Sequence, residues 1–238
     1  MVGPKGQKTV SAAGVLWTSA SGNCKLGRAA VYVRRRPERS AAYQVVRQNL
    51  ETWLAQRRSG RLVAGTCYEY EMFSGALSVD RETYPNTLYG IAKDKLRKEL
   101  FELQQSKNFY LTWTRNFYPH GDGQSSHSFY SLMKSRVNSS NSEIQLSNSE
   151  GILDFIFVIE LSEILTIFTL NADNAGVVNL GSGHPKLVID FARDIAKAND
   201  WTLTFTSEAE SSRKFESNSF WSDNFKLKNL LSKYNPAK

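Results

Sequence analysis

The chain has 238 residues, of which 41% are hydrophobic, so it is long enough for one sizeable core or a domain with a smaller lobe. Its net charge of +7 comes from the first 61 residues, which hold 12 Lys and Arg against two Glu, so we expect no nucleic-acid partner for the main part of the chain. The two cysteines and the lack of a secretory start favour a reducing, cytoplasmic location, and the most apolar run, residues 155–170, is shorter than the ~20 residues of a membrane span.

The N-terminal part changes character near residue 40. Residues 1–40 are rich in Gly, Ser, Ala and Arg and show no helical or strand periodicity, which indicates a basic, poorly ordered segment. From residue 40, apolar residues recur at three- and four-residue spacing, which predicts a helix that ends near residue 59. A strand at 62–64 follows, and then a loop over 67–86.

Helices and strands alternate over the rest of the chain. We expect helices at 87–106, 126–137, 160–170 and 185–199, and strands at 109–113, 144–146, 155–158, 177–180 and 201–205. Strands that alternate with helices of this length indicate right-handed crossovers and a mainly parallel sheet. The predicted fold class is therefore α/β.

The helix expected at 87–106 carries Tyr89 and Lys93, which are four residues apart. Residues at this spacing share a helix face, so the ammonium of Lys93 can lie near the phenol of Tyr89 and lower its pKa from about 10 toward the range useful for acid–base chemistry. Thr66 follows the strand at 62–64, where open α/β sheets collect ligand-binding groups. A Tyr and a Lys at this spacing are also common on surface helices, so the pair alone leaves both interpretations open.

Five segments carry motifs that add context to this pair. They are the strand with its hydroxyl at 61–70, P-x-x-x-Y-G-x-x-K at 85–93, T-R-N-F-Y-P-H-G at 114–121, G-x-x-N-x-G-S-G at 176–183 and F-W-S-D-N-F-K-L at 220–227. In this order they resemble the extended short-chain dehydrogenase/reductase family, also called NAD-dependent epimerase/dehydratases. The last segment resembles a signature of members that act on nucleotide-linked deoxysugars.

The resemblance implies an NAD(P)-dependent epimerase, reductase or dehydratase of a nucleotide sugar, such as those of polysaccharide biosynthesis. NAD or NADP would exchange hydride with a sugar carbon, while Tyr89 moves the proton of the hydroxyl or carbonyl group. By the same resemblance the catalytic residues are Thr66, Tyr89, Lys93 and Asn49, the cofactor contacts are Tyr89, Lys93 and Phe117, and the substrate contacts are Thr66, Tyr118 and Trp221.

The resemblance also implies a domain organisation. Residues 41–125 would form the remaining part of a Rossmann-like, doubly wound parallel sheet that binds NAD(P). Residues 126–238 would form a smaller, mixed substrate-binding lobe whose elements partly return to the core, and residues 1–40 an atypical basic segment. A parallel sheet without all of its strands exposes apolar edges, so we expect a compensating partner, for which a homodimer is one arrangement.

The chain departs from the family pattern at its N-terminus. The fingerprint Gly-x-x-Gly-x-x-Gly, which binds pyrophosphate at a helix start, is missing, and the early glycines have neither its spacing nor a preceding apolar strand. The turn at 181–183 lacks a third glycine, and the resemblance places it in the substrate lobe. Leu153 also stands before Asp154 where many relatives carry Arg. Two explanations are a truncated or mistranslated gene and a divergent protein that has lost cofactor binding.

Two further hypotheses stand beside the enzyme. The first is a catalytically inactive, truncated homologue that binds a nucleotide sugar or a partner protein without turnover. The second is a basic adaptor for RNA or acidic membranes, which would bind through residues 1–40. A metal site is not expected, because His120, His127 and His184 are scattered and neither cysteine has a metal-ligand partner at close spacing.

Overall fold

The computed structural model has a parallel sheet at its centre, covered by helices on both faces. It describes residues 14–16, 61–71, 73–107, 109–137, 139, 141–171, 174–207 and 219–234. The strand order is β1 (Gly14–Leu16), β2 (Arg61–Thr66), β4 (Leu111–Asn116) and β9 (Gly176–Leu180), and all three pairings are parallel. The predicted α/β class with a parallel, doubly wound sheet is confirmed.

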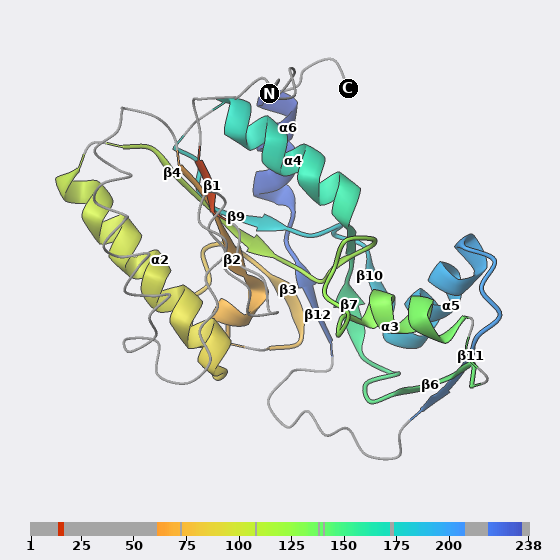
Figure 1. Cartoon of the computed structure of the whole chain (residues 1–238). Helices are drawn as coiled ribbons and strands as arrows, with labels where there is room; N and C mark the ends of the chain where they lie inside the picture. The colour runs from red at the N-terminus through yellow and green to blue at the C-terminus, as the bar shows by residue number, and fades with distance from the viewer. Residues whose placement is uncertain are drawn as a thin grey trace, which may run out of the picture.

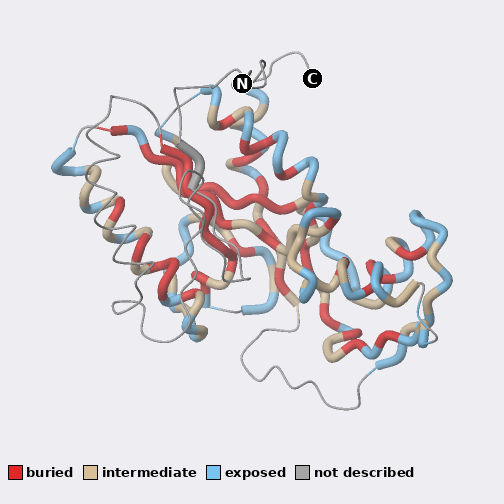
Figure 2. Tube along the Cα trace, in the orientation of Figure 1, coloured by how far each residue is buried: buried red, intermediate tan, exposed pale blue. Residues whose placement is uncertain are grey.

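Three helices form the outer layers of this sheet. Figure 1 shows α2 (Leu88–Ser106) on one face, and α4 (Val158–Asn171) with α6 (Phe225–Tyr234) on the other. Successive side chains of β2 alternate between these layers: Leu62 packs in the cluster of α4 and α6, and Val63 packs in the cluster of α2. Figure 2 shows that the central strands are buried along their length. Both faces are therefore covered, as a parallel sheet requires.

Helix α2 follows from local sequence signals. The side chain of Thr87 caps its start by accepting a hydrogen bond from the backbone N of Gly90 at 3.0 Å. Ala92, Leu96 and Leu100 recur at four-residue spacing and lie buried against β2 and β4. Burial of a leucine of this kind stabilises the fold by roughly 1.5–3 kcal/mol, so α2 and its Tyr89 and Lys93 are fixed firmly on the sheet.

A smaller part of the molecule lies beside the carboxyl ends of the central strands (Figure 1). It contains α3 (Phe129–Arg136), α5 (Val188–Ala198) and the parallel pair β6 (Glu143–Leu146) and β11 (Thr204–Ser207), which share a hydrophobic cluster around Met133 and Ala192. A second sheet joins this part to the centre, in the order β10 (Pro185–Leu187), β7 (Ile152–Asp154), β12 (Ser219–Ser222) and β3 (Gly75–Leu77). The pair β5 (Pro119–His120) and β8 (Ile156–Phe157) runs alongside.

Several sequence predictions need correction. The helix predicted from residue 185 begins at Val188, because residues 185–187 form β10 against β7. The loop predicted over 67–86 contains the 3₁₀ turn η2 (Cys67–Glu69) and β3, and β11 is not the last strand, because β12 follows it. These strands are so short that partner strands specify them rather than periodicity.

The N-terminal predictions are tested at one place. No strand was expected before residue 40, yet β1 runs over Gly14–Leu16 and pairs in parallel with β2. The helix predicted up to residue 59, with Asn49 on it, lies outside the described residues, as does the rest of the basic segment.

The described part of the chain shows neither a membrane-spanning helix nor a cluster of metal ligands. None of the helices that the structure describes is long and apolar enough to cross a membrane. Across the same ranges, no three His, Cys, Asp or Glu side chains gather as metal ligands. The cytoplasmic location and the homodimer stay predictions.

Candidate active site

The site begins where β2 ends. Thr66 is buried at the last position of β2, and its Oγ1 accepts a hydrogen bond from the backbone N of Tyr68 at 3.3 Å. The backbone N of Thr66 in turn donates to Oε1 of Glu69 at 2.8 Å. This reciprocal pair is the capping box of η2, and it fixes the hydroxyl of Thr66 at the carboxyl end of a parallel strand.

Helix α2 brings Tyr89 and Lys93 to the same strand end. The Nζ atom of Lys93 donates to the carbonyl O of Ala64 at 2.6 Å and lies 5.8 Å from the ring centre of Tyr89. The ring of Tyr68 meets the ring of Tyr89 edge-on, with 6.4 Å between their centres. The structure therefore gathers Tyr89, Lys93 and the turn after Thr66 in one place.

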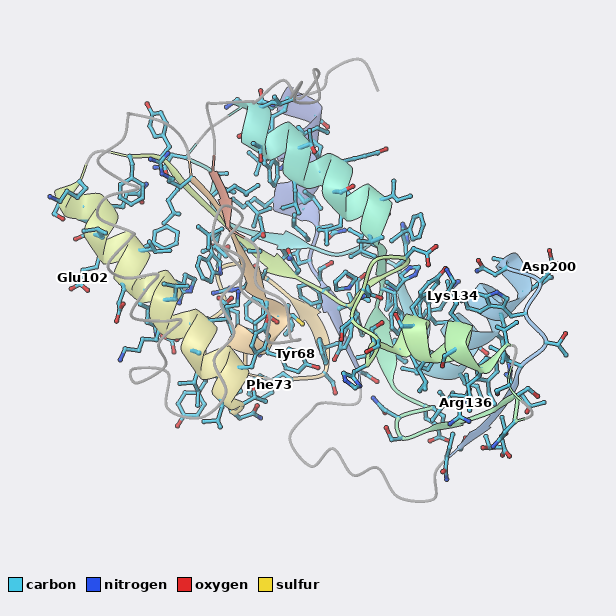
Figure 3. The ribbon with its side chains drawn as sticks, viewed as in Figure 1. Tyr68, Phe73, Glu102, Lys134, Arg136 and Asp200 are labelled. Atoms are coloured by element: carbon cyan, nitrogen blue, oxygen red, sulfur yellow. The ribbon has the colours of Figure 1, made fainter. Side chains whose placement is uncertain are left out.

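Glycine is required at position 90, between the two proposed catalytic groups. A Cβ atom there would lie 2.1 Å from the carbonyl O of Tyr68, which is far inside contact distance. The first turn of α2 can therefore approach η2 closely, because Gly90 has no side chain. Figure 3 shows Tyr68 near the start of α2, whereas Glu102 lies toward its other end.

Burial changes the acid–base behaviour of Lys93. The side chain is 4% exposed, and removal from water lowers its pKa from the ordinary lysine value to about 7, while the negative charge of Glu69 acts in the opposite direction. A cation beside a phenol favours the phenolate form. A lysine that titrates near neutral pH next to a tyrosine is suited to proton transfer at that pH.

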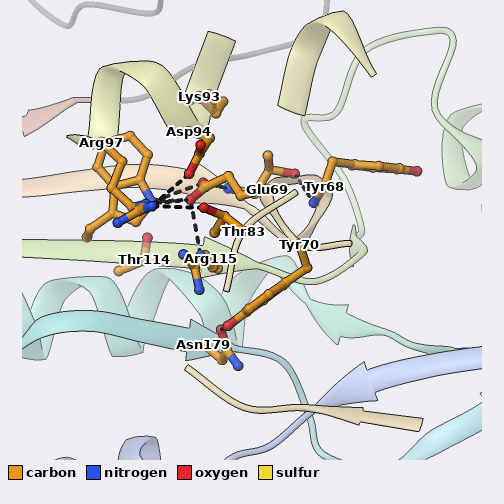
Figure 4. A network of polar contacts seen from close by, with 12 residues as sticks. Tyr68, Glu69, Tyr70, Thr83, Lys93, Asp94, Arg97, Thr114, Arg115 and Asn179 are labelled. Atoms are coloured by element: carbon orange, nitrogen blue, oxygen red, sulfur yellow. Dashed lines mark hydrogen bonds and ion pairs between the residues drawn. The ribbon is translucent and has the colours of Figure 1, made fainter. Parts of the chain in front are cut away.

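A fully buried carboxylate, Glu69, lies behind these groups (Figure 4). Trp113 Nε1 donates to both of its oxygens at 3.0 Å, and Arg115 Nε donates to Oε2 at 3.1 Å. A Cβ atom at Gly65 would lie 2.3 Å from Oε1 of Glu69, so the absence of a side chain at Gly65 makes room for the carboxylate. Glu69 is not among the site residues predicted from the sequence, although the pattern Thr66-x-x-Glu69 is a recognisable capping box.

The other predicted site residues lie at different depths. Tyr118 is half-buried and its hydroxyl lies 3.1 Å from that of Tyr68, next to the proposed site. Phe117 is fully buried in the cluster that also contains Phe220. Trp221 follows Phe220 on β12, so its side chain points to the opposite side of that strand. The roles proposed for these residues stay predictions.

The turn at 181–183 is built around Asp154 rather than around a ligand. The carboxylate of Asp154 is fully buried and accepts hydrogen bonds from the backbone N atoms of Ser182 at 2.7 Å and Gly183 at 3.1 Å. Ser222 donates to the same carboxylate from its backbone N at 3.0 Å and also from its hydroxyl. An internal carboxylate thus takes up the amides that a phosphate would need, which agrees with the placement of this turn outside the phosphate loop.

Leu153, the departure from the family pattern next to Asp154, is also a structural residue. It is 5% exposed and packs in one cluster with Phe117 and Phe220. Where the resemblance would place an arginine for substrate contact, this chain has a core leucine.

The residues present fit one end of a dinucleotide better than the other. Lys93 and Tyr89 offer an ammonium and a hydroxyl on one face of α2, which suit a ribose and a sugar oxygen. After β1, the sequence up to residue 27 contains Gly22 and Gly27, whose five-residue spacing does not match the glycine pattern of a pyrophosphate loop. The fit is therefore good at the nicotinamide ribose and poor at the pyrophosphate.

A hydroxyl at the end of a parallel strand, followed by a helix that carries Tyr and Lys one turn apart, defines a Rossmann-like protein of the short-chain dehydrogenase/reductase class. The chain belongs to the NAD dependent epimerase/dehydratase family, whose model matches residues 41–181. The resemblance drawn from the five motifs is thereby confirmed.

Relatives and solved structures support the same fold. The curated dTDP-6-deoxy-L-talose 4-dehydrogenase (NAD(+)) of Aggregatibacter actinomycetemcomitans is 24% identical over 160 residues, which are 67% of this chain and 59% of that protein. UDP-glucuronic acid 4-epimerase from Bacillus cereus, in complex with UDP-glucuronic acid and NAD, matches with a TM-score of 0.69 at 19% identity over 87% of this chain and 68% of that one. MoeE5 with UDP-glucuronic acid and NAD matches with a TM-score of 0.67 at 19% identity, over 85% and 70%. This chain spans about three fifths of the length of the curated relative.

Proposed function

We propose that this protein is an NAD(P)-dependent enzyme that epimerises, reduces or dehydrates a sugar linked to a nucleotide. The observation that supports the proposal is the position of Lys93, whose ammonium lies beside Tyr89 and bonds to the strand that ends in Thr66. The class of substrate is supported by the curated relative, which is named for a dTDP-linked sugar, and by the two compared structures, which hold UDP-glucuronic acid.

Each residue of this group has a separate task in the proposed reaction. Tyr89 gives a proton to the sugar oxygen or takes one from it, and Lys93 favours the phenolate of Tyr89 and binds the ribose of the cofactor. Thr66 donates a hydrogen bond to the same sugar oxygen and so polarises it. The cofactor, when bound, supplies the hydride exchange with a sugar carbon.

NAD is the cofactor that we propose over NADP. The curated relative is named as an NAD(+) enzyme, and the two solved structures compared with this chain hold NAD. The proposed substrate contacts are Thr66, Tyr118 and Trp221, of which Tyr118 lies beside Tyr68 at the same strand end.

A nucleotide sugar is expected to raise the melting temperature of the full chain. A ligand that binds only the folded state at 100 times its Kd stabilises a protein by about 2.7 kcal/mol. The measurement is thermal unfolding with a series of UDP- and dTDP-linked hexoses, and the control is the same hexose 1-phosphates without the nucleotide. No shift with any nucleotide sugar at millimolar concentration would count against the proposed substrate class.

A second candidate function is favoured by the missing glycine fingerprint. A homologue that cannot hold the pyrophosphate of NAD would bind a nucleotide sugar or a partner protein without turnover. Stabilisation by nucleotide sugars together with none by NAD(H) or NADP(H) is the result that would favour this candidate.

A further inference from the structure

The buried carboxylate of Glu69 is surrounded by hydrogen-bond donors. The backbone N of Thr66 and the indole N of Trp113 donate to Oε1, and Trp113 and Arg115 donate to Oε2. Arg97 Nε lies 3.4 Å from Oε2. Thr66, Trp113 and Arg115 all present N–H donors, which an ionised carboxylate accepts, whereas a protonated one would set its own O–H against a donor. Burial acts in the opposite direction and raises the pKa of Glu69, while the charge of Arg115 and these hydrogen bonds lower it.

Glu69 is linked to both sides of the proposed active site. On one side it holds the backbone N of Thr66, and on the other its charge acts on Lys93, whose ammonium is hydrogen-bonded to Ala64, two residues before Thr66. Thr66 and Lys93 are therefore both held at the end of β2, and the side chain of Glu69 extends from η2 toward α2 (Figure 4).

We propose that Glu69 is a positioning residue that holds Thr66 in place and favours the protonated form of the buried Lys93 behind Tyr89. Its effect on a reaction rests on the proposed function. Its electrostatic link to Lys93 does not, because that link needs neither cofactor nor substrate.

The charged groups around Glu69 are paired with one another. Arg97 from α2 and Arg115 from β4 both form ion pairs with the carboxylate of Glu69. On α2, Asp94 is bonded to Arg97 and Lys98, and Glu99 and Glu102 lie further along the helix. With the charge of Glu69 removed, desolvation would act on Lys93 without that opposing charge and would favour the neutral amine.

The direct test is the titration of Lys93 by NMR in protein labelled with ¹³C at the lysine Cε atoms, with the signal assigned by its loss in Lys93→Arg. In the wild type we expect a midpoint at about 7. In Glu69→Gln we expect the midpoint at a pH about one unit lower or more, which is a tenfold weaker affinity for the proton. The matched control Glu71→Gln, at an exposed position, is expected to titrate as the wild type does. An unchanged midpoint in folded Glu69→Gln would overturn the proposal.

A second variant tests the same link from the other side, if Glu69→Gln does not fold. In Lys93→Met, with ¹³C at the glutamate Cδ atoms, the carboxyl of Glu69 has lost a neighbouring cation and must titrate at a higher pH than in the wild type. Coupling between two sites is reciprocal, so an unmoved Glu69 midpoint would contradict the inference.

Catalysis supplies the readout for Thr66. Under the proposed function, Glu69→Gln lowers kcat and moves the pH profile in the direction in which Lys93 moves, whereas Glu69→Asp, which keeps the charge, restores the profile. If the protein shows no turnover but the titration midpoint of Lys93 still moves in Glu69→Gln, the proposed function is rejected and the electrostatic inference is kept. If the protein turns over substrate and the pH profile of Glu69→Gln equals that of the wild type, the proposed function is kept and the electrostatic inference is rejected.

Discussion

Tyr89→Phe is expected to lower kcat by about 10²–10⁴-fold, which is the usual contribution of a positioned proton donor. The phenol of Tyr89 lies on the face of α2 that also carries Lys93, and Phe keeps the ring but has no proton to transfer. The substitution removes one hydroxyl from a half-buried side chain, so the free energy of unfolding should change by about 1 kcal/mol or less.

Steady-state kinetics with a nucleotide sugar, together with urea unfolding, separate the two effects. The control is Tyr84→Phe, because Tyr84 is 73% exposed before the start of α2 and has no role in the proposed reaction. Turnover of Tyr89→Phe within threefold of the wild type would reject Tyr89 as the proton-transfer residue.

Asp154→Asn is expected to destabilise the fold by about 1–3 kcal/mol, the cost of leaving a buried hydrogen-bond donor without its partner. Asp154 on β7 accepts from the turn after β9 and from Ser222 on β12, so it connects the central sheet to the second sheet. The amide of asparagine places an N–H₂ donor where those groups also donate, and at least one buried donor loses its partner.

The free energy of unfolding in urea measures this loss. Asp190→Asn provides the matched control, because Asp190 is exposed on α5 and pairs with Arg193 at 3.4 Å, where surface pairs contribute less than about 1 kcal/mol. Equal stability of the two variants would mean that Asp154 does not hold the central sheet and the second sheet together.

The elements with long periodic patterns could be predicted from the sequence. Three elements were predicted to within a few residues: the strand that ends in Thr66, the helix that carries Tyr89 and Lys93, and the strand at 176–180. The strands are mainly apolar runs, and the helix has one apolar stripe at helical spacing. The proximity of Lys93 to Tyr89 also follows from helix geometry alone.

The short strands and the buried polar groups could not be predicted in this way. Strands β3, β10 and β12 are three or four residues long and form because partner strands bond to them, which no local pattern reports. The environment of Glu69 is built by Trp113 and Arg115, more than forty residues away in the sequence. Only the capping box that links it to Thr66 is local.

The most direct test of this account is calorimetric titration of the full chain with NAD⁺, NADH, NADP⁺ and NADPH. We predict saturable binding of at least one of them, with NAD(H) preferred, and binding that is about tenfold or more weaker in Lys93→Met, since the ammonium would bind the ribose. The absence of binding heat with all four dinucleotides, in folded protein at high concentration, would contradict the claim that this chain places a cofactor beside Tyr89.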